Sequence, residues 1–308
     1  MGRRRSFERR LLGAKENSLR VAFLCLGVMG APMAGHLAQA GHRVSVYNRS
    51  AKAREAWLSQ HSDYDCWAGA TPAEAVVGAE FVMVCTGRDA DLREIALGEA
   101  GAFGAMEPGS VLVDHTTVSA ELARELAAEA ETRGIGWLDA PISGGQLGAE
   151  RGELTIMVGG DEAVYRRAAP VLDVYAKKHL LMGPAGSGQL SKMVNQICIA
   201  GMVQALAEGL HFAKRSGLDA ERVVEVIAQG AAQSWQMDNR ASTMLAGEFD
   251  FGFAVDWMRK DLGIALAEAR RCGAELALTA AVDELYAEVQ ARGGARWDTS
   301  SLISLLEP

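Results

Sequence analysis

The chain has 308 residues, 49% hydrophobic and 6% aromatic, which is an ordinary globular balance with enough length for two domains. Its formal net charge of −8 argues against a nucleic-acid-binding protein, which would need a basic face. No apolar run reaches membrane-spanning length without interruption by polar or charged residues.

Residues 1–19 differ in composition from the rest of the chain, because five arginines fall within the first ten positions. The segment has no apolar h-region, so it does not read as a secretory signal. An Arg-rich transit peptide is an alternative, although Glu8 and Glu16 argue against it. We expect a disordered leader that contributes nothing to the fold.

The five cysteines are widely spaced and odd in number, with no CxxC pair and no metal-ligand spacing. We therefore predict no metal site, and reduced thiols that lie mostly in the core of a cytoplasmic protein. The cysteines are Cys25, Cys66, Cys85, Cys198 and Cys272.

From Arg20 the sequence predicts a strand, a glycine turn, a helix and a second strand that ends at Asn48. A dinucleotide-binding unit needs glycines at this turn, so that backbone N–H groups and the helix N-terminus can approach the pyrophosphate. Two glycines match the second and third positions of GxGxxG, whereas Cys25 stands at the first. A βα turn without a ligand is the alternative. The predicted cofactor-binding residues of this loop are Gly27, Val28, Met29 and Gly30.

The residues at the end of the second predicted strand indicate whether the chain uses NAD or NADP. An NAD-specific unit places Asp or Glu there, whereas an Arg accommodates the 2′-phosphate of NADP. This chain has Asn48, Arg49 and Ser50, with no carboxylate to repel the phosphate. We therefore predict NADP rather than NAD, the alternative being that Arg49 is a solvated turn residue.

Apolar strands then alternate with helical segments, which predicts a parallel sheet covered on both faces. Ligands bind beyond the carboxyl ends of such strands. Thr86 and Thr116 stand at these ends, where their hydroxyls could reach the nicotinamide, and His115 reads as a structural residue. The predicted segments are 80–86, 89–97, 110–115, 119–133 and 136–140.

A second glycine-rich loop follows the strand that ends near Asp139. Ser143, Gly144 and Gly145 offer a hydroxyl and unencumbered N–H groups, which suit a substrate carboxylate. A tight glycine turn without a ligand is an equal alternative.

Residues 186–212 read as a long helix that is apolar on nearly every face except for one charge. Lys192 and Asn195 are three residues apart, so they project from the same face and can converge on one small ligand. A buried lysine in a cleft is a candidate acid/base. The alternative is that Lys192 reaches the surface and Asn195 caps a neighbour.

All later segments have helical periodicity, which predicts an all-α tail whose apolar faces also contribute subunit contacts. Within it, Lys260 and Asp261 form a charged pair that by itself reads as a solvated surface. The predicted helices are 220–230, 234–246, 255–271 and 276–292, with a short segment at 299–306.

Four motifs together resemble the signatures of the β-hydroxyacid dehydrogenase family, which includes 3-hydroxyisobutyrate dehydrogenase and tartronate semialdehyde reductase. In chain order they are LGVMGAPMAGHL, DAPISGG, GSGQLSKMVNQ and RKDLGIAL, and the resemblance covers nearly all of residues 20–308. It implies an α/β Rossmann domain with a parallel sheet (residues 20–183) and an all-α C-terminal domain (residues 184–308), joined by a long interdomain helix. It also implies homodimers or homotetramers formed through the helices.

The resemblance assigns a role to each matching residue. It places Gly27, Gly30 and Arg49 on the dinucleotide, Thr116 on its nicotinamide side, and Lys260 on the cofactor. It places Ser143, Gly144 and Gly145 on the substrate carboxylate, Lys192 in catalysis and Asn195 in substrate orientation. Two departures stand out, Cys25 in the glycine loop and Cys85-Thr86-Gly87 where relatives usually have an apolar-Pro turn.

The expected activity is hydride transfer between NADP and a short β-hydroxy acid or semialdehyde, with Lys192 as the general acid/base. An imine reductase is an alternative, but those enzymes usually replace the catalytic lysine. A non-catalytic NADP-binding module is a second alternative, which the presence of Lys192, Asn195 and Ser143 makes weaker.

Overall fold

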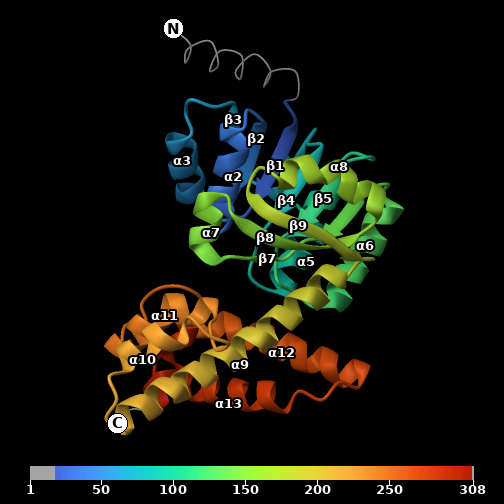
Figure 1. The fold of residues 1–308 in the computed structure, drawn as a ribbon. Helices are drawn as coiled ribbons and strands as arrows, with labels where there is room; N and C mark the ends of the chain where they lie inside the picture. Colours follow the sequence, from blue (N-terminus) through green and yellow to red (C-terminus); the bar gives the residue numbers. More distant parts are fainter. Residues whose placement is uncertain (1–17, 307–308) are drawn as a thin grey trace. The chain divides into compact units, whose positions relative to one another are not determined.

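The computed structural model describes residues 18–306 and divides into two compact units (Figure 1). The first unit is Met1–Lys192 and the second is Met193–Pro308, so the division falls inside helix α9 (Ser187–Arg215). Of the predicted leader, only Ser18 and Leu19 are among the described residues. Both make hydrogen bonds to the turn before the second strand, from Ser18 Oγ to the Gly41 carbonyl and from the Leu19 N–H to His42 Nδ1.

The first unit is built on one sheet, whose strands in the described residues run in the order β3-β2-β1-β4-β5-β6-β8-β7, with β9 beside β8. The strands from β3 to β6 are parallel, as predicted. The strands are β1 (Arg20–Leu24), β2 (Arg43–Tyr47), β3 (Cys66–Ala68), β4 (Phe81–Val84), β5 (Val111–Asp114), β6 (Gly136–Asp139), β7 (Ile142–Ser143), β8 (Leu154–Gly160) and β9 (Ala176–Gly183).

Beyond β6 the sheet is mixed, which the prediction of a parallel sheet did not include. Strand β8 runs antiparallel to β6 and β7, and β9 runs parallel to β8. The connection from β7 to β8 holds only α7 (Gly145–Arg151) and short turns, which is less chain than a parallel crossover requires.

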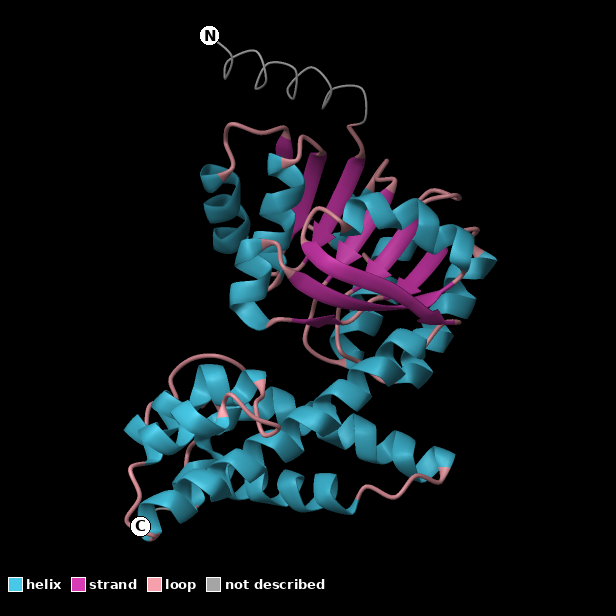
Figure 2. Cartoon of the chain, in the orientation of Figure 1, coloured by secondary structure: helices cyan, strands magenta, loops and turns pink. Residues whose placement is uncertain are grey.

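Both faces of the sheet are buried, which confirms the predicted covering (Figure 2). Along β1, Val21 and Phe23 face one hydrophobic core, whereas Ala22 and Leu24 face the other. This alternation follows from the two-residue period of a strand. The helices of this unit are α2 (Gly30–Gln39), α3 (Ala51–Gln60), α4 (Pro72–Val76), α5 (Asp89–Leu97), α6 (Ala120–Thr132), α7 and α8 (Glu162–Leu172), with a 3-10 turn at Ala102–Gly104.

The second unit is helical, and no strand follows β9 in the described residues apart from an isolated bridge between Ala254 and Asp298. Its core is formed by apolar side chains such as Val203, Met258 and Tyr286. This confirms the predicted fold class, a Rossmann-like domain followed by an all-α domain. The elements after α9 are α10 (Ala220–Ile227), α11 (Trp235–Ala246), α12 (Val255–Cys272), α13 (Ala277–Ala291) and the 3-10 helix Thr299–Leu305.

Helix α9 has 29 residues, and its sequence is apolar enough to cross a membrane by length and composition alone. Long core helices share this property, and α9 contributes Ala200, Val203 and Leu210 to the core of the second unit. Packing therefore accounts for part of its apolar character, whereas Val194, Met202 and Phe212 on the same helix are exposed.

Candidate functional site

The turn between β1 and α2 has the shape that a dinucleotide-binding loop requires. Cys25, at the position of the first fingerprint glycine, has φ 78°, a left-handed conformation that non-glycine residues rarely adopt. A Cβ on Gly30 would collide with the carbonyl oxygen of Cys25, so this position admits only glycine. Helix α2 begins without a side-chain cap. Its first N–H groups are therefore suited to a pyrophosphate, with Gly27 and Val28 exposed at the tip of the loop.

Asn48 joins this loop to the end of β2. Its side-chain Oδ1 accepts the Leu26 N–H at 3.0 Å, and its carbonyl accepts Nη1 of Arg54 at 2.5 Å. Arg49 is exposed, and Ser50 uses its hydroxyl oxygen to cap α3 by accepting the Ala53 N–H at 3.3 Å. The sequence interpretation missed Arg54, whose only signal was a basic residue in the first turn of the helix that follows the Asn-Arg-Ser loop.

Thr86 and Thr116, predicted to lie near the nicotinamide, are brought together by the sheet. The Thr86 N–H donates to Thr116 Oγ1 at 3.0 Å, and the Thr116 N–H donates to Oδ1 of Asp114 at 2.9 Å. Burial raises the pKa of the Cys25 thiol to about 11, and its hydrogen bond to the Thr86 side chain opposes the shift. The thiol is therefore neutral at physiological pH and lies beside Thr86.

His115 is a structural residue. It is buried, with Nδ1 2.7 Å from the Ala140 carbonyl and Nε2 2.8 Å from the Tyr175 hydroxyl. Since a carbonyl only accepts, Nδ1 carries the proton and Nε2 accepts from Tyr175. Burial lowers the pKa of His115 to about 4, so the ring stays neutral at physiological pH.

Asp139, at the end of β6, holds the start of α9. Its Oδ1 accepts the Gly186 N–H at 2.7 Å and its Oδ2 accepts the Gln189 N–H at 2.9 Å. Burial raises the pKa of this carboxyl to about 6, and these backbone hydrogen bonds oppose the shift. The sequence interpretation assigned no role to Asp139, because its partners lie 47 and 50 residues further along the chain.

The predicted carboxylate-binding loop follows directly. Ser143 is the last residue of β7 and is half-buried, whereas Gly144 and Gly145 are exposed at the start of α7. Lys192 lies in the second turn of α9 and is only 7% exposed, which is unusual for a lysine.

In the second unit, two predicted site residues belong to one network. Asn195 Nδ2 donates to Oε1 of Gln196 at 2.7 Å, and Gln196 Nε2 donates to Oδ2 of Asp261 at 2.6 Å. The other oxygen of Asp261 lies 3.2 Å from Nζ of Lys260, which also stands 5.7 Å from the ring centre of Trp257. Asn195 and Lys260 are therefore connected through two side chains that the sequence interpretation did not assign.

Trp235, the first residue of α11, lies at the surface of the second unit. The side chain is 54% exposed and lies under the guanidinium of Arg240, at 4.9 Å from the ring centre. Arg240 in turn pairs with the buried Asp298 at 3.0 Å. Trp235 thus packs against a cation at the surface of its unit.

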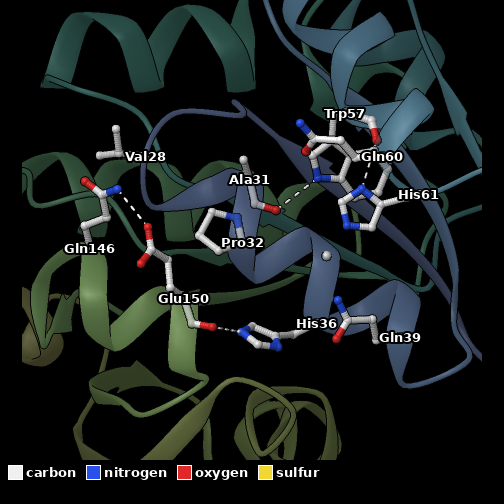
Figure 3. A pocket seen from close by; sticks show the side chains of 11 residues that line it. Val28, Ala31, Pro32, His36, Gln39, Trp57, Gln60, His61, Gln146 and Glu150 are labelled. Atoms are coloured by element: carbon white, nitrogen blue, oxygen red, sulfur yellow. Dashed lines mark hydrogen bonds between the residues drawn. The ribbon is translucent and has the colours of Figure 1, made fainter.

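A groove of about 380 Å³ runs along α2 between α3 and α7 (Figure 3). Its polar groups include His36, which bonds the carbonyls of Ala149 and Glu150, and His61, which bonds the Trp57 carbonyl. The groove shares one residue, Val28, with the predicted cofactor-binding loop, and none of the predicted catalytic or substrate-binding residues lines it. In residues 18–306 no group of three or more His, Cys, Asp or Glu side chains could hold a metal ion.

Both units match known protein families. Residues 20–183 match the NAD-binding domain of 6-phosphogluconate dehydrogenase, and residues 186–306 match the domain described as NAD-binding of NADP-dependent 3-hydroxyisobutyrate dehydrogenase. The boundary between these two matches lies within a few residues of the start of α9.

Individual relatives cover almost the whole chain. An uncharacterised oxidoreductase of Shewanella frigidimarina is 58% identical over 94% of this chain and 98% of its own length. The 2-hydroxy-3-oxopropionate reductase of Escherichia coli is 35% identical over 94% of this chain and 97% of its own length. A structure of 3-hydroxyisobutyrate dehydrogenase of Mycobacterium tuberculosis with L-serine is 32% identical, with a TM-score of 0.85 over 94% of this chain and 100% of that chain. The protein is therefore an NAD(P)-binding oxidoreductase that belongs to the β-hydroxyacid dehydrogenase family.

Proposed function

We propose that this protein is an NADP-dependent β-hydroxyacid dehydrogenase, which interconverts a short β-hydroxy acid and its semialdehyde with Lys192 as general acid/base. The observation that carries the proposal is the burial of Lys192, at 7% exposure, one turn before Asn195 on α9. A buried lysine in a helix needs a reason, and catalysis in a water-poor cleft is one.

The nicotinamide, when bound, supplies or accepts a hydride. The work of the chain is to hold the substrate and move one proton. In reduction, the Lys192 ammonium donates a proton to the oxygen of the carbonyl group as negative charge develops there; in oxidation, the neutral amine takes it back. Asn195 orients that oxygen, while Ser143 and the N–H groups of Gly144 and Gly145 hold the carboxylate.

The proposed preference for NADP rests on the loop after β2. Arg49 is exposed there, and no carboxylate stands at Asn48 or Ser50 to repel a 2′-phosphate. The remaining proposed cofactor contacts are Gly27, Val28, Met29, Gly30, Thr86, Thr116 and Lys260. An arginine at this position is also consistent with the NADP-dependent enzyme named by the match to residues 186–306.

The test is oxidation of NADPH and NADH by the purified protein with a panel of short aldehyde acids and one cyclic imine. We expect turnover of a semialdehyde with NADPH, and a loss in kcat on the order of a thousandfold in Lys192→Ala with little change in NADPH binding. Lys214→Ala, an exposed lysine on the same helix, is the matched control and should retain full activity. Turnover of the imine alone, or binding of NADPH without any turnover, would favour the imine reductase or the non-catalytic module.

The protein is further proposed to be a cytoplasmic homodimer or homotetramer assembled through its C-terminal helices. Exposed apolar side chains on the second unit support this assembly. Among them are Phe212, which is 69% exposed, and Val226, which is 72% exposed. Light scattering after gel filtration measures the assembly. A monomer at micromolar concentration would contradict it.

A further inference from the structure

The start of α9 is fixed to the sheet by two buried side chains, those of Asp139 and Gln189. Asp139 accepts the N–H groups of Gly186 and Gln189 through its two different oxygens, and it is fully buried. One carboxylate thereby satisfies two of the N–H groups that the beginning of a helix leaves without partners. The first turn of α9 is consequently tied to the carboxyl end of β6.

At Gly188, in this first turn, the backbone lies so close to the strands that there is no space for a side chain. A Cβ on Gly188 would lie 2.5 Å from the carbonyl oxygens of both Asp139 and Met157, and 2.9 Å from Oδ2 of Asp139. Such distances are well below van der Waals contact. The entry point of α9 is thus defined by direct contact between its backbone and strands β6 and β8.

Gln189 makes the second attachment, to the loop that follows β5. Its Nε2 donates to the Thr116 carbonyl at 2.8 Å, its Oε1 accepts the Val118 N–H at 3.1 Å, and the side chain is fully buried. The same Thr116 accepts the Thr86 N–H through its hydroxyl oxygen. One residue of α9 is therefore bonded to the loop that carries the predicted nicotinamide contact.

We infer that Asp139 and Gln189 are positioning residues, which set the place of Lys192 relative to the nicotinamide end of the cofactor site. This inference rests on the proposed function, because it takes Lys192 as the group that moves the proton. Lys192 is one turn beyond Gln189 on a rigid helix, so a shift of the first turn moves its amine with it.

The hydrogen bonds from the N–H groups of Gly186 and Gln189 to Asp139, here called the clasp, require the ionised carboxylate, because both of its oxygens accept. Protonation would place a donor against a donor. Burial raises the pKa of this carboxyl to about 6. The titratable or charged groups on the elements that pack against it include Asp114, its register partner on β5, His115, Arg124 beside Gly186, and Lys192 on α9. None of the backbone contacts changes charge, so acidification acts on the clasp through Asp139.

Two variants test the inference against one control. Asp139→Asn keeps the size of the side chain but loses one acceptor and its titration, and Gln189→Leu keeps the volume but loses both bonds to the β5 loop. We expect each to lower kcat by about 100-fold, as a misplacement of about 1 Å does, while the KM for NADPH changes by less than about threefold. Wild-type kcat should fall on the acid side near the titration of Asp139, and this limb should disappear in Asp139→Asn.

Asp161→Asn is the matched control, because Asp161 also caps a helix by accepting two N–H groups, those of Ala163 and Val164 at the start of α8. It should lower stability modestly and leave kcat and the pH profile unchanged. Equal effects of Asp139→Asn and Asp161→Asn would overturn the inference. If Asp139→Asn fails to fold, Gln189→Leu decides, and unchanged kcat in that variant would likewise overturn it.

Hydrogen exchange separates this inference from the proposed function. Amides of residues 186–190 should exchange at least tenfold faster in Asp139→Asn than in wild type, and this readout needs no substrate. Faster exchange without any turnover by the wild-type protein would refute the proposed function while confirming the clasp. Turnover by the wild type with unchanged exchange in Asp139→Asn would refute the clasp alone.

Discussion

Gln196 donates from Nε2 to Oδ2 of Asp261 at 2.6 Å, which joins α9 to α12 inside the second unit. Asp261 is 2% exposed on its side chain, and its second oxygen pairs with Lys260. The two oxygens of this carboxylate are therefore linked to two residues with different proposed roles, Asn195 in substrate orientation and Lys260 in cofactor binding.

Asp261→Asn separates these functions. The Asn oxygen can still accept from Gln196, whereas the ion pair with Lys260 is lost. We expect the KM for NADPH to rise about tenfold with a smaller change in the KM for the semialdehyde. Gln196→Leu should do the reverse, because it removes the support of Asn195. Steady-state kinetics with each reactant varied in turn measures both effects.

Asp283→Asn is the control for this pair of variants. Asp283 pairs with Arg259 across α12 and α13, at 3.1 Å, in a more exposed position. It should leave both KM values within about twofold of wild type, since partly exposed ion pairs contribute little. Identical kinetic changes in all three variants would mean that the network only maintains the fold.

Arg49 and Arg54 should differ in their effect on cofactor preference. Arg49→Gln removes a charge proposed to pair with the 2′-phosphate, so the ratio of kcat/KM for NADPH over NADH should fall about 10- to 100-fold. Arg54→Gln instead loosens the Asn48 loop and should weaken both cofactors alike. An unchanged ratio in Arg49→Gln would remove the basis for NADP preference.

Cys25 should reverse the usual order of stability between alanine and glycine. At an ordinary strand position glycine is less stable than alanine by about 0.5–1 kcal/mol, but at φ 78° alanine keeps the strain that glycine relieves. We expect Cys25→Gly to be more stable than Cys25→Ala by about 1 kcal/mol in urea unfolding. At Cys66, in strand β3, Cys66→Ala should be the more stable of the two. The same order at both sites would show that Cys25 is unstrained.

His115 should make the protein less stable in acid. In the unfolded chain the imidazole has its ordinary pKa of 6.5 and takes up a proton as the pH falls through that value, whereas the folded form stays neutral down to about 4. Acidification between these values favours the unfolded state, by about 2 kcal/mol between pH 7 and pH 5. His115→Asn should therefore lose less stability over this interval than wild type.

Asp139 should have the opposite effect on stability in acid to that of His115. Its folded pKa is raised from 3.8 to about 6, so protonation on acidification favours the folded state. Asp139→Asn should lose more stability than wild type between pH 7 and pH 5. Parallel stability curves for the two variants would contradict both assignments.

The sequence alone predicted the parts of the fold that depend on local pattern. The helix 89–97 agrees with α5, and the strand 110–115 contains β5, because both have clear periodicity and turn signals. Strands β3 and β9 were missed. Strand β3 has only three residues, and β9 lies at the sheet edge, where it has two consecutive exposed lysines and no buried residue.

The supporting residues of the site could not be predicted in the same way. No local motif predicts the hydrogen bonds of Asp139, Gln189 and Asp261 described above, because their partners are 47 or more residues away. Their roles depend on tertiary contacts. The glycine loops and the single lysine in an apolar helix, in contrast, can be recognised from the residues next to them in the sequence.

Asn48 also bears on how cofactor use could change in evolution. Aspartate at this position would retain the oxygen that accepts the Leu26 N–H, so the glycine loop would keep its support while a negative charge appeared beside the ribose. Asparagine and aspartate codons differ by one nucleotide. One nucleotide change at Asn48 could therefore shift the proposed cofactor preference from NADP towards NAD while the hydrogen bond that supports the glycine loop is kept.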